Sequence, residues 1–368
     1  MGLPGNAVTN NTFVICPEIG SGIGGLADYT LRVIEHWPDG GAVQMIVPKG
    51  GRSDGTFAGR LLEIERSSDA LLAALPASGG KVLLQYSAYG FDRFGYPRWL
   101  LRALTDWKNR GGGLLVAMFH EIWTFWPVLN KNYLVQQLHR RDLRMLLERT
   151  DVTFTSTASQ AQHLQALVPK CAVQLLPVGS NVCPSREPRY DREGGVAVLF
   201  GLLPTRCRTL QAMRIELKSL ARAGAISKII SIGVGDSAEE LQREHALLTE
   251  LHLRGGVEQR GALAESVVSG IMLEAMFGIS AQDEPSITKS STLMAYGAHG
   301  MNIISPVAGP ERSPPLCWFT KPAELIEGIT AAELADRARH LRDWQQRTAS
   351  WPYIAEQFAH ALQLRATR

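Results

Sequence analysis

The strongest constraint on the fold is a repeated alternation of short apolar runs with longer segments of helical periodicity. The apolar runs predict strands at 13–16, 43–48, 82–86, 114–120, 152–157 and 173–178. The segments between them predict helices at 27–37, 68–75, 99–110, 135–149 and 159–167. Near-continuous apolar strands separated by helices are typical of a parallel sheet covered on both faces. The first half of the chain is therefore predicted to be an α/β domain.

The alternation stops and then starts again, which predicts two domains. Residues 177–195 are rich in proline and glycine and lack periodicity, as a linker does. Strands are then predicted at 196–200, 228–233, 257–261, 277–282 and 302–306, and a helical tail at 322–365. A chain of 368 residues is also too long for one ordinary core. We expect one domain at 1–180, a second at 181–350 and a C-terminal helix at 351–368.

Composition excludes several classes of protein. Hydrophobic residues make up 45% and charged residues 20% of the chain, as in a globular protein, and the net charge of +3 does not suggest a partner nucleic acid. No apolar stretch is long enough for a transmembrane helix, and the N-terminus does not resemble a signal peptide. The five cysteines are scattered and form no CxxC pair, which predicts reduced thiols in a cytoplasmic protein.

A glycine-rich segment, EIGSGIGGLADYT at 18–30, follows the first predicted strand. Its Gly20-x-Gly22-x-x-Gly25 formally matches the dinucleotide-binding fingerprint. That site also needs an acidic residue at the end of the second strand, where the chain has Pro48-Lys49-Gly50-Gly51-Arg52. Lys49 or Arg52 could instead bind the 2′-phosphate of NADP, so an NADP site is one alternative. A tight turn without a ligand is another. We favour contact with a substrate or a phosphate of another kind.

Aromatic side chains gather after the third and fourth strands, at 85–100 and 119–126. The carboxyl ends of strands are where α/β proteins bind ligands. Aromatic faces with polar edges suit a carbohydrate. The candidate contacts with a saccharide are Tyr86, Tyr89, Tyr96, Glu121 and Trp123. Core packing is the alternative for the tryptophan.

His120 ends the fourth predicted strand and is the first candidate catalytic residue. At that place it can donate a hydrogen bond near a reacting centre, and a core histidine is the alternative. Glu121 can hold the ring of His120 or the following turn. The sequence HEIW is not the zinc motif HExxH, and no second histidine has a metal-like spacing, so we expect no metal site.

Two segments of the second domain suit an anion. Arg206 and Arg208 follow its first strand, where arginines can bind a diphosphate, and solvated arginines are the alternative. Gly233 belongs to another glycine turn, for which a structural role is equally open.

The stretch 281–300 joins acids, hydroxyls and a lysine to the start of a helix, where backbone amides attract anions. Its candidate donor-binding residues are Ser286, Ile287, Thr288, Lys289, Ser290, Ser291 and Thr292. Asp283 and Glu284 beside them can hold a sugar hydroxyl or a ribose. Helix capping by the serines alone is the alternative.

Taken in chain order, these motifs resemble those of retaining glycosyltransferases with the GT-B fold, similar to glycosyltransferase family 4. They are the GGxADYT-like loop, His-Glu after the fourth strand, LLPVGSN at 175–181, FGLLP at 200–204 and a W-x-x-x-A-x-x-F-like helix at 351–358. The resemblance implies two Rossmann-like doubly wound domains that face a central cleft. It also implies a C-terminal helix that returns to the first domain.

The resemblance also implies roles for individual residues. Gly24 and Gly25 would lie near the donor phosphate and the acceptor, and His120 near the transferred sugar. Arg206, or as the second candidate Arg208, would bind the donor diphosphate. Asp283 or Glu284 would supply the first acid of an E-x7-E pattern, whose second acid is replaced here by Ser291 or Thr292.

The implied activity is hexosyl transfer (EC 2.4) in polysaccharide biosynthesis. A UDP- or GDP-sugar is the donor and a hydroxyl of a glycan, glycolipid or other saccharide is the acceptor, with retention and without a cofactor or metal ion. An NADP-dependent oxidoreductase and a non-catalytic nucleotide- or sugar-binding protein are the alternatives. The basic segment 131–149 predicts a solvated helix face, or a peripheral contact with the inner face of a membrane and a lipid-linked acceptor.

Overall fold

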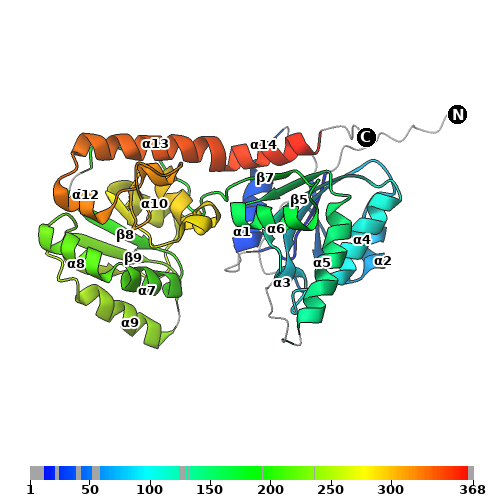
Figure 1. Ribbon diagram of the computed structural model, residues 1–368, viewed down its shortest axis with the longest axis horizontal. Helices are drawn as coiled ribbons and strands as arrows, with labels where there is room; N and C mark the ends of the chain where they lie inside the picture. The colour runs from blue at the N-terminus through cyan, green and yellow to red at the C-terminus, as the bar shows by residue number, and fades with distance from the viewer. Residues whose placement is uncertain are drawn as a thin grey trace. The chain divides into compact units, whose positions relative to one another are not determined.

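The computed structural model describes residues 12–20, 25–38, 43–51, 59–123, 130, 132–192, 194–235 and 237–363. The chain divides into two compact units (Figure 1). Unit 1 comprises Met1–Pro177 and Trp351–Arg368, and unit 2 comprises Val178–Ser350.

Unit 1 is built on a parallel sheet, which has seven strands in the described part of the chain, in the order β3-β2-β1-β4-β5-β6-β7. The strands are β1 (Thr12–Ile15), β2 (Val43–Pro48), β3 (Arg60–Ile64), β4 (Gly80–Ser87), β5 (Gly113–Glu121), β6 (Val152–Thr155) and β7 (Val173–Leu175). The strand order reverses between β1 and β4. Ligands of doubly wound sheets bind at the carboxyl ends of the strands beside such a reversal.

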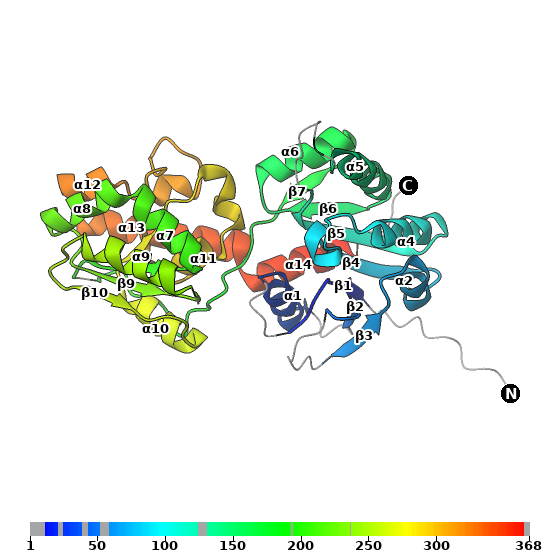
Figure 2. The same ribbon diagram turned by 90° about the horizontal axis from the view of Figure 1, so that it is seen from below.

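Helices cover both faces of this sheet (Figure 2). On one face α4 packs between α2 and α5, and on the other α1 packs against α14. The helices of the unit are α1 (Gly25–Glu35), α2 (Ser68–Ala74), α3 (Ala88–Phe91), α4 (Arg98–Asn109), α5 (Tyr133–Leu147), α6 (Ala158–Leu167) and α14 (Trp351–Ala361). Successive strand residues point to opposite faces. In β4 this places Tyr86 in the core beneath α4 and α5 and turns Gln85 toward α1.

Unit 2 contains a second parallel sheet, with five strands among the described residues, in the order β10-β9-β8-β11-β12. They are β8 (Val196–Phe200), β9 (Lys228–Ile232), β10 (Val257–Gln259), β11 (Phe277–Ile279) and β12 (Asn302–Ile304). The helical segments are α7 (Leu203–Ala212), α8 (Arg214–Ala223), α9 (Ala238–Thr249), α10 (Glu265–Glu274), η2 (Glu284–Lys289), α11 (Ser291–Ala298), η3 (Leu316–Trp318), α12 (Pro322–Glu327) and α13 (Ala331–Ala349). Here the strand order reverses between β8 and β11.

A buried tyrosine connects α11 to β8 at the point where the strand order of unit 2 reverses. The hydroxyl of Tyr296 in α11 donates to the carbonyl of Val198 (3.1 Å) and accepts from the amide of Phe200 (2.8 Å). Gly278 of β11 makes room for the ring, because a Cβ there would lie 2.5 Å from it. The end of β8 is thereby held against α11.

The two predicted α/β units with parallel sheets are present, but the sequence patterns missed some elements. Strand β3 was not predicted because Arg60 and Glu63 interrupt its apolar run, as an edge strand allows. Helix α7 begins at Leu203, only three residues after β8, with Pro204 in its first turn. In the described part of the chain, no helix is long and apolar enough to cross a membrane.

Candidate functional site

His120 lies at the carboxyl end of β5 on the face covered by α1. Its Nε2 lies 2.7 Å from Oε1 of Gln85 on the neighbouring β4, so in this pairing Nε2 carries the proton. The ring of Tyr29 from α1 meets the imidazole edge to face, with 4.7 Å between centroids. The backbone is held as well, since Gln160 donates to the carbonyl of His120 (3.0 Å). The orientation of the imidazole is therefore fixed from two sides.

Two polar atoms beside His120 are buried and have no hydrogen-bond partner among the described residues. They are the hydroxyl of Tyr29 and the side-chain nitrogen of Gln85, whose residues are 4% and 0% exposed. Burial raises the pKa of Tyr29 above its usual value, so the hydroxyl is a donor at neutral pH. A buried polar atom without a partner costs about 1–3 kcal/mol, which favours its completion by a ligand or water.

A second cluster lies on the opposite face, beneath α5. The Tyr86 hydroxyl lies 2.6 Å from Nε2 of His139, and the ring of Tyr96 stacks on His139 with 5.5 Å between centroids. Burial lowers the pKa of His139 to about 4, so this histidine is neutral at pH 7. The Tyr96 hydroxyl donates to Asp142 (2.6 Å), and burial together with this carboxylate raises the pKa of Tyr96 to about 12.

This aromatic cluster lines a pocket of about 430 Å³ at the carboxyl end of β4, with Tyr89, Tyr96 and Trp123 in its wall. A second pocket, of about 310 Å³, also has Tyr89 and Trp123 in its wall and adds Glu121, which accepts a hydrogen bond from Ser87 (3.1 Å). Tyr86 reaches the first pocket only through His139, because its own side chain is completely buried. Aromatic faces and fixed polar groups in one hollow match the surfaces of a saccharide.

The loop over the first pocket is ordered by local contacts. Oδ1 of Asp92 accepts hydrogen bonds from the amides of Phe94 (2.8 Å) and Tyr96 (3.3 Å). Gly95 has φ +74°, and a Cβ there would lie 2.8 Å from Cζ of Tyr89. The Tyr89 ring therefore lies directly against the backbone, and its position is set before any ligand binds.

Arg206 is buried, whereas the diphosphate contact and the solvated position considered from the sequence would both leave its guanidinium accessible. It is 2% exposed, and its guanidinium donates to both carboxylate oxygens of Glu244 (2.7 and 3.2 Å). Burial alone would raise the pKa of Glu244, but hydrogen bonds from Arg206, Ser231 and Gln259 outweigh it, and the pKa is lowered. The arginine that was expected to bind the diphosphate is thus one partner of an internal ion pair, which connects α7 to α9.

The neighbouring candidates also have structural roles or lie at the surface. Gly233 packs against β8, because a Cβ there would lie 2.0 Å from the carbonyl oxygen of Gly201. Arg208 is exposed, and its Nε donates to the carbonyl of Pro204 (3.4 Å). Of the two arginines, only Arg208 is accessible to a ligand.

The start of α11 lies at the carboxyl end of β8. The Ser290 hydroxyl caps the helix by accepting from the amide of Leu293 (3.2 Å). The amides of Ser291 and Thr292 occupy the first two helical positions, which have no acceptor within a helix. A Cβ on Gly201 would lie 3.5 Å from Oγ1 of Thr292, so β8 and α11 adjoin here. These amides form an anion-attracting helix terminus at the reversal point.

The preceding 3₁₀ turn supplies a cation and backbone support. Lys289 is exposed and forms no ion pair within the residues that the structure describes. Ile287 is buried in the core, the carbonyl of Thr288 accepts from Val178 (2.9 Å), and the amide of Ser286 donates to Asp283 (3.0 Å). Ser286, Ile287 and Thr288 therefore shape the turn that presents Lys289.

The two acids at this edge differ in their partners. Glu284 forms an ion pair with Arg312 (3.1 Å), whereas Asp283 is exposed and has no ion-pair partner in the described part of the chain. Asp283 is thus the carboxylate that is open to a ligand. Within the same described residues, no group of three or more His, Cys, Asp and Glu side chains is suited to hold a metal ion.

The glycine loop can be followed only in part. Gly24 lies outside the described residues. Gly25 is the first residue of α1, and a Cβ there would meet no atom within 4 Å. Among the described residues, no atom would therefore contact a side chain at this position.

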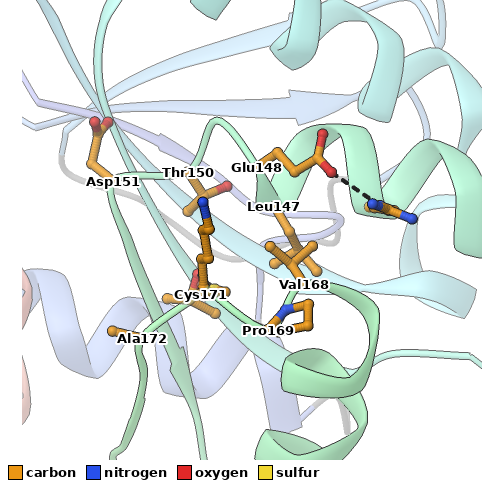
Figure 3. A pocket seen from close by; sticks show the side chains of 11 residues that line it. Leu147, Glu148, Thr150, Asp151, Val168, Pro169, Cys171 and Ala172 are labelled. Atoms are coloured by element: carbon orange, nitrogen blue, oxygen red, sulfur yellow. Dashed lines mark hydrogen bonds and ion pairs between the residues drawn. The ribbon is translucent and has the colours of Figure 1, made fainter. Parts of the chain in front are cut away.

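A pocket of about 510 Å³ lies away from these residues, at the amino ends of β6 and β7 (Figure 3). Its wall includes Lys170, Cys171 and the ion pair between Arg144 and Glu148 (2.9 Å). It lies at the opposite edge of the sheet from the candidate site.

Several residues of the candidate site were missed from the sequence. Gln85 had a signal, because it is a polar residue inside the apolar run VLLQY. Tyr29, His139 and Asp142 had none, since helical periodicity does not reveal which strand residue a helix side chain meets.

Comparison with known proteins identifies the fold. No protein-family model and no curated protein sequence matches the chain. The matching solved structures include sucrose-phosphate synthase (tll1590) from Thermosynechococcus elongatus, at 15% identity and a TM-score of 0.59, covering 95% of this chain and 98% of that one. Anabaena Alr3699/HepE in complex with UDP and glucose matches at 11% identity and 0.59, covering 97% and 100%. The apo lipopolysaccharide outer core galactosyltransferase WaaB matches at 14% and 0.56, covering 96% and 98%.

These likenesses extend over almost the full length of both chains in each pair. The chain has the GT-B fold, and the predicted fold class is confirmed. At such low identity the likeness concerns the fold alone.

Proposed function

We propose that this protein is a glycosyltransferase that moves a hexosyl group from a nucleotide sugar to a hydroxyl of a saccharide or lipid-linked acceptor. In this proposal unit 2 binds the donor and unit 1 the acceptor, and transfer proceeds with retention and without a metal ion. One observation carries the proposal: the same GT-B chain has, in unit 2, a helix start whose amides suit an anion and, in unit 1, an aromatic pocket with polar edges.

The donor site follows from the charge of a nucleoside diphosphate. Lys289, the amides of Ser291 and Thr292 and the dipole of α11 all favour negative charge. Because that charge grows as the diphosphate leaves, such fixed donors stabilise the transition state more than the ground state. Asp283 is the group that we assign to a donor hydroxyl.

His120 is the proposed catalytic residue of unit 1. Gln85 and Tyr29 fix its imidazole, so the ring can hold the transferred sugar without first being ordered. The nucleophile is the acceptor hydroxyl, which attacks the anomeric carbon on the face from which the diphosphate departs. The bond from that carbon to the diphosphate breaks as the glycosidic bond forms, and the leaving diphosphate takes up the proton of the hydroxyl. The aromatic pocket holds the acceptor sugar.

Two alternative functions have weaker support. An NADP site would need a cation at the end of β2, where Lys49 is paired with Glu65 and Arg52 lies outside the described residues. A non-catalytic binding protein is favoured by the hydroxyl residues at the second acid position, but it leaves the fixed His120 without a role. Free cysteines and the use of nucleotide sugars lead us to propose a cytoplasmic role in polysaccharide biosynthesis.

The proposal is tested by thermal unfolding with UDP, GDP and NADP. A ligand at 100 times its Kd stabilises the native state by about 2.7 kcal/mol, which raises Tm by roughly 5–10 °C in a domain of this size. We expect this shift with UDP or GDP, and a smaller one for Lys289→Gln. Arg222→Gln is the matched control, because Arg222 lies in the last turn of α8, at the opposite edge of the sheet. Stabilisation by NADP and by neither nucleoside diphosphate would contradict the proposal.

A further inference from the structure

The pocket at the amino ends of β6 and β7, which we call the amino-edge pocket, lies outside the candidate site (Figure 3). Its volume of about 510 Å³ exceeds the 430 and 310 Å³ of the two pockets that Tyr89 and Trp123 line. Sites for small molecules usually have volumes of about 300–1,000 Å³. We propose that the amino-edge pocket binds a small organic carboxylate with a compact apolar body, whose charge is held by Lys170.

Hydrogen bonds within the chain fix the wall of this pocket. The Thr150 hydroxyl donates to the carbonyl of Leu146 (3.0 Å) at the end of α5. In the loop between α6 and β7, the amide of Cys171 donates to the carbonyl of Val168 (2.9 Å). The Cys171 thiol donates to Oγ1 of Thr153 (3.4 Å), which connects this loop to β6. The pocket is therefore formed before a ligand binds, and binding requires little further ordering.

The inner part of the wall is apolar. Leu147 and Val168, which are 2% and 8% exposed, line the pocket together with Pro169 and Ala172 (Figure 3). An inorganic ion would leave these side chains in contact with water. An apolar group of a ligand would cover them, which is favourable because it removes apolar surface from water.

The charges of the wall leave one cation without a partner. Glu148 pairs with Arg144 (2.9 Å), and Asp151 pairs with Lys108 (2.6 Å). Each acid of the wall is thus already met by a cation. Lys170 also lines the pocket, is exposed, and forms no ion pair with any residue that the structure describes. The pocket therefore has a net positive charge at Lys170.

The helix that ends at this pocket does not cancel that charge. Helix C-termini are partly negative because their last carbonyls have no partner within the helix. At the end of α5, however, the carbonyl of Leu146 accepts from Thr150, and that of Met145 accepts from Nη1 of Arg149 (2.9 Å). Since these carbonyls already have donors, the ammonium of Lys170 stays available to a ligand.

Charge and shape together select a carboxylate. Its single negative charge can be neutralised by one ammonium through a charge-assisted hydrogen bond, and its apolar body covers Leu147 and Val168. A phosphate monoester carries more charge than the one unpaired cation neutralises. A nucleobase would find no aromatic side chain among the residues of this wall.

Helix α5 lines both the amino-edge pocket and the aromatic pocket. Arg144, Leu147 and Glu148 near its end belong to the first, whereas Gln136 and His139 belong to the second. A carboxylate in the amino-edge pocket thus contacts the same helix that positions His139. Its binding does not depend on glycosyl transfer.

The experiment measures binding of hexanoate and benzoate to the full-length protein by ligand-observed nuclear magnetic resonance, without nucleotide or saccharide. Hexanamide and benzamide have the same shapes without the charge. We expect at least one acid to bind roughly 10-fold more tightly than its amide, as for one hydrogen bond between charged groups. Lys170→Gln should reduce the affinity for the acid to that for the amide. Ala172→Trp, which fills the pocket from its rim, should abolish binding of the acid.

The matched control is Arg110→Gln, because Arg110 is exposed after the end of α4 and lies outside the wall of the pocket. It should bind the acid as the unmodified protein does, and far-ultraviolet dichroism checks that each variant is folded. The proposal is overturned if neither acid binds more tightly than its amide, or if Lys170→Gln and Ala172→Trp bind as well as the control. It is also overturned if inorganic phosphate binds as tightly as the acids and displaces them, which would show a simple ion site.

Discussion

Replacing Arg206 with methionine distinguishes an internal ion pair from a phosphate ligand. The guanidinium donates to both oxygens of Glu244, and its Nη1 also donates to the carbonyl of Gly201 at the end of β8. Methionine fills much of the same volume but donates no hydrogen bond. The variant leaves the carboxylate of Glu244 buried, with only Ser231 and Gln259 as donors.

The size of the effect follows from this burial. Arg206 and Glu244 are 2% and 0% exposed, so the abandoned carboxylate cannot be solvated without disrupting α9. Removing one partner of a buried ion pair costs about 3–5 kcal/mol. In a domain of this size each kcal/mol lowers Tm by about 2–4 °C, which predicts a fall of roughly 10 °C for unit 2.

Calorimetric unfolding measures this fall, and two variants make it interpretable. Arg206→Met with Glu244→Leu should recover much of the loss, because no charge is left unpaired. Arg208→Met, two residues away and exposed, should change stability by less than about 0.5 kcal/mol. The reasoning is refuted if Arg206→Met keeps full stability and loses only nucleotide binding.

Three further predictions concern unit 1. His120→Ala should lower kcat about 100-fold, measured by nucleotide release, whereas the loss of the hydrogen bond to the buried Gln85 should cost only about 1–3 kcal/mol in thermal unfolding; unchanged turnover would remove its catalytic role. Tyr29→Phe removes a buried hydroxyl without a partner, so the free energy of unfolding of the ligand-free protein should rise by about 1 kcal/mol, measured by chemical denaturation. A lower free energy of unfolding would show that the hydroxyl is hydrogen-bonded. Lowering the pH from 6.5 to 4 should reduce the free energy of unfolding by about 3 kcal/mol, because the unfolded chain protonates His139 in this window while the folded chain does not. Calorimetry of His139→Gln should show a flatter dependence of stability on pH.

The sequence predicted the architecture well because the signals of the fold are local. Apolar runs, turn residues and helical periodicity revealed two α/β units and the break between them. Strand β3 was missed because an edge strand can carry Arg60 and Glu63 without disrupting the core.

The site could be predicted only in outline, because its contacts join distant residues. Nothing near Arg206 in the sequence shows that Glu244 neutralises it 38 positions later. Likewise, alternation along β4 separates Tyr86 from Gln85, and the helix packed on each face decides what each side chain meets. Strand ends locate a site, whereas the partners of each side chain depend on tertiary packing.

The central claim, sugar transfer from a nucleotide sugar, is tested most directly by incubating the protein with UDP- and GDP-sugars and saccharide acceptors. Released nucleoside diphosphate and the anomeric signals of the product are followed by nuclear magnetic resonance. We predict acceptor-dependent release that persists with excess chelator and yields a product of the donor's anomeric configuration. The contradicting result is that no donor and acceptor pair reacts although UDP or GDP binds.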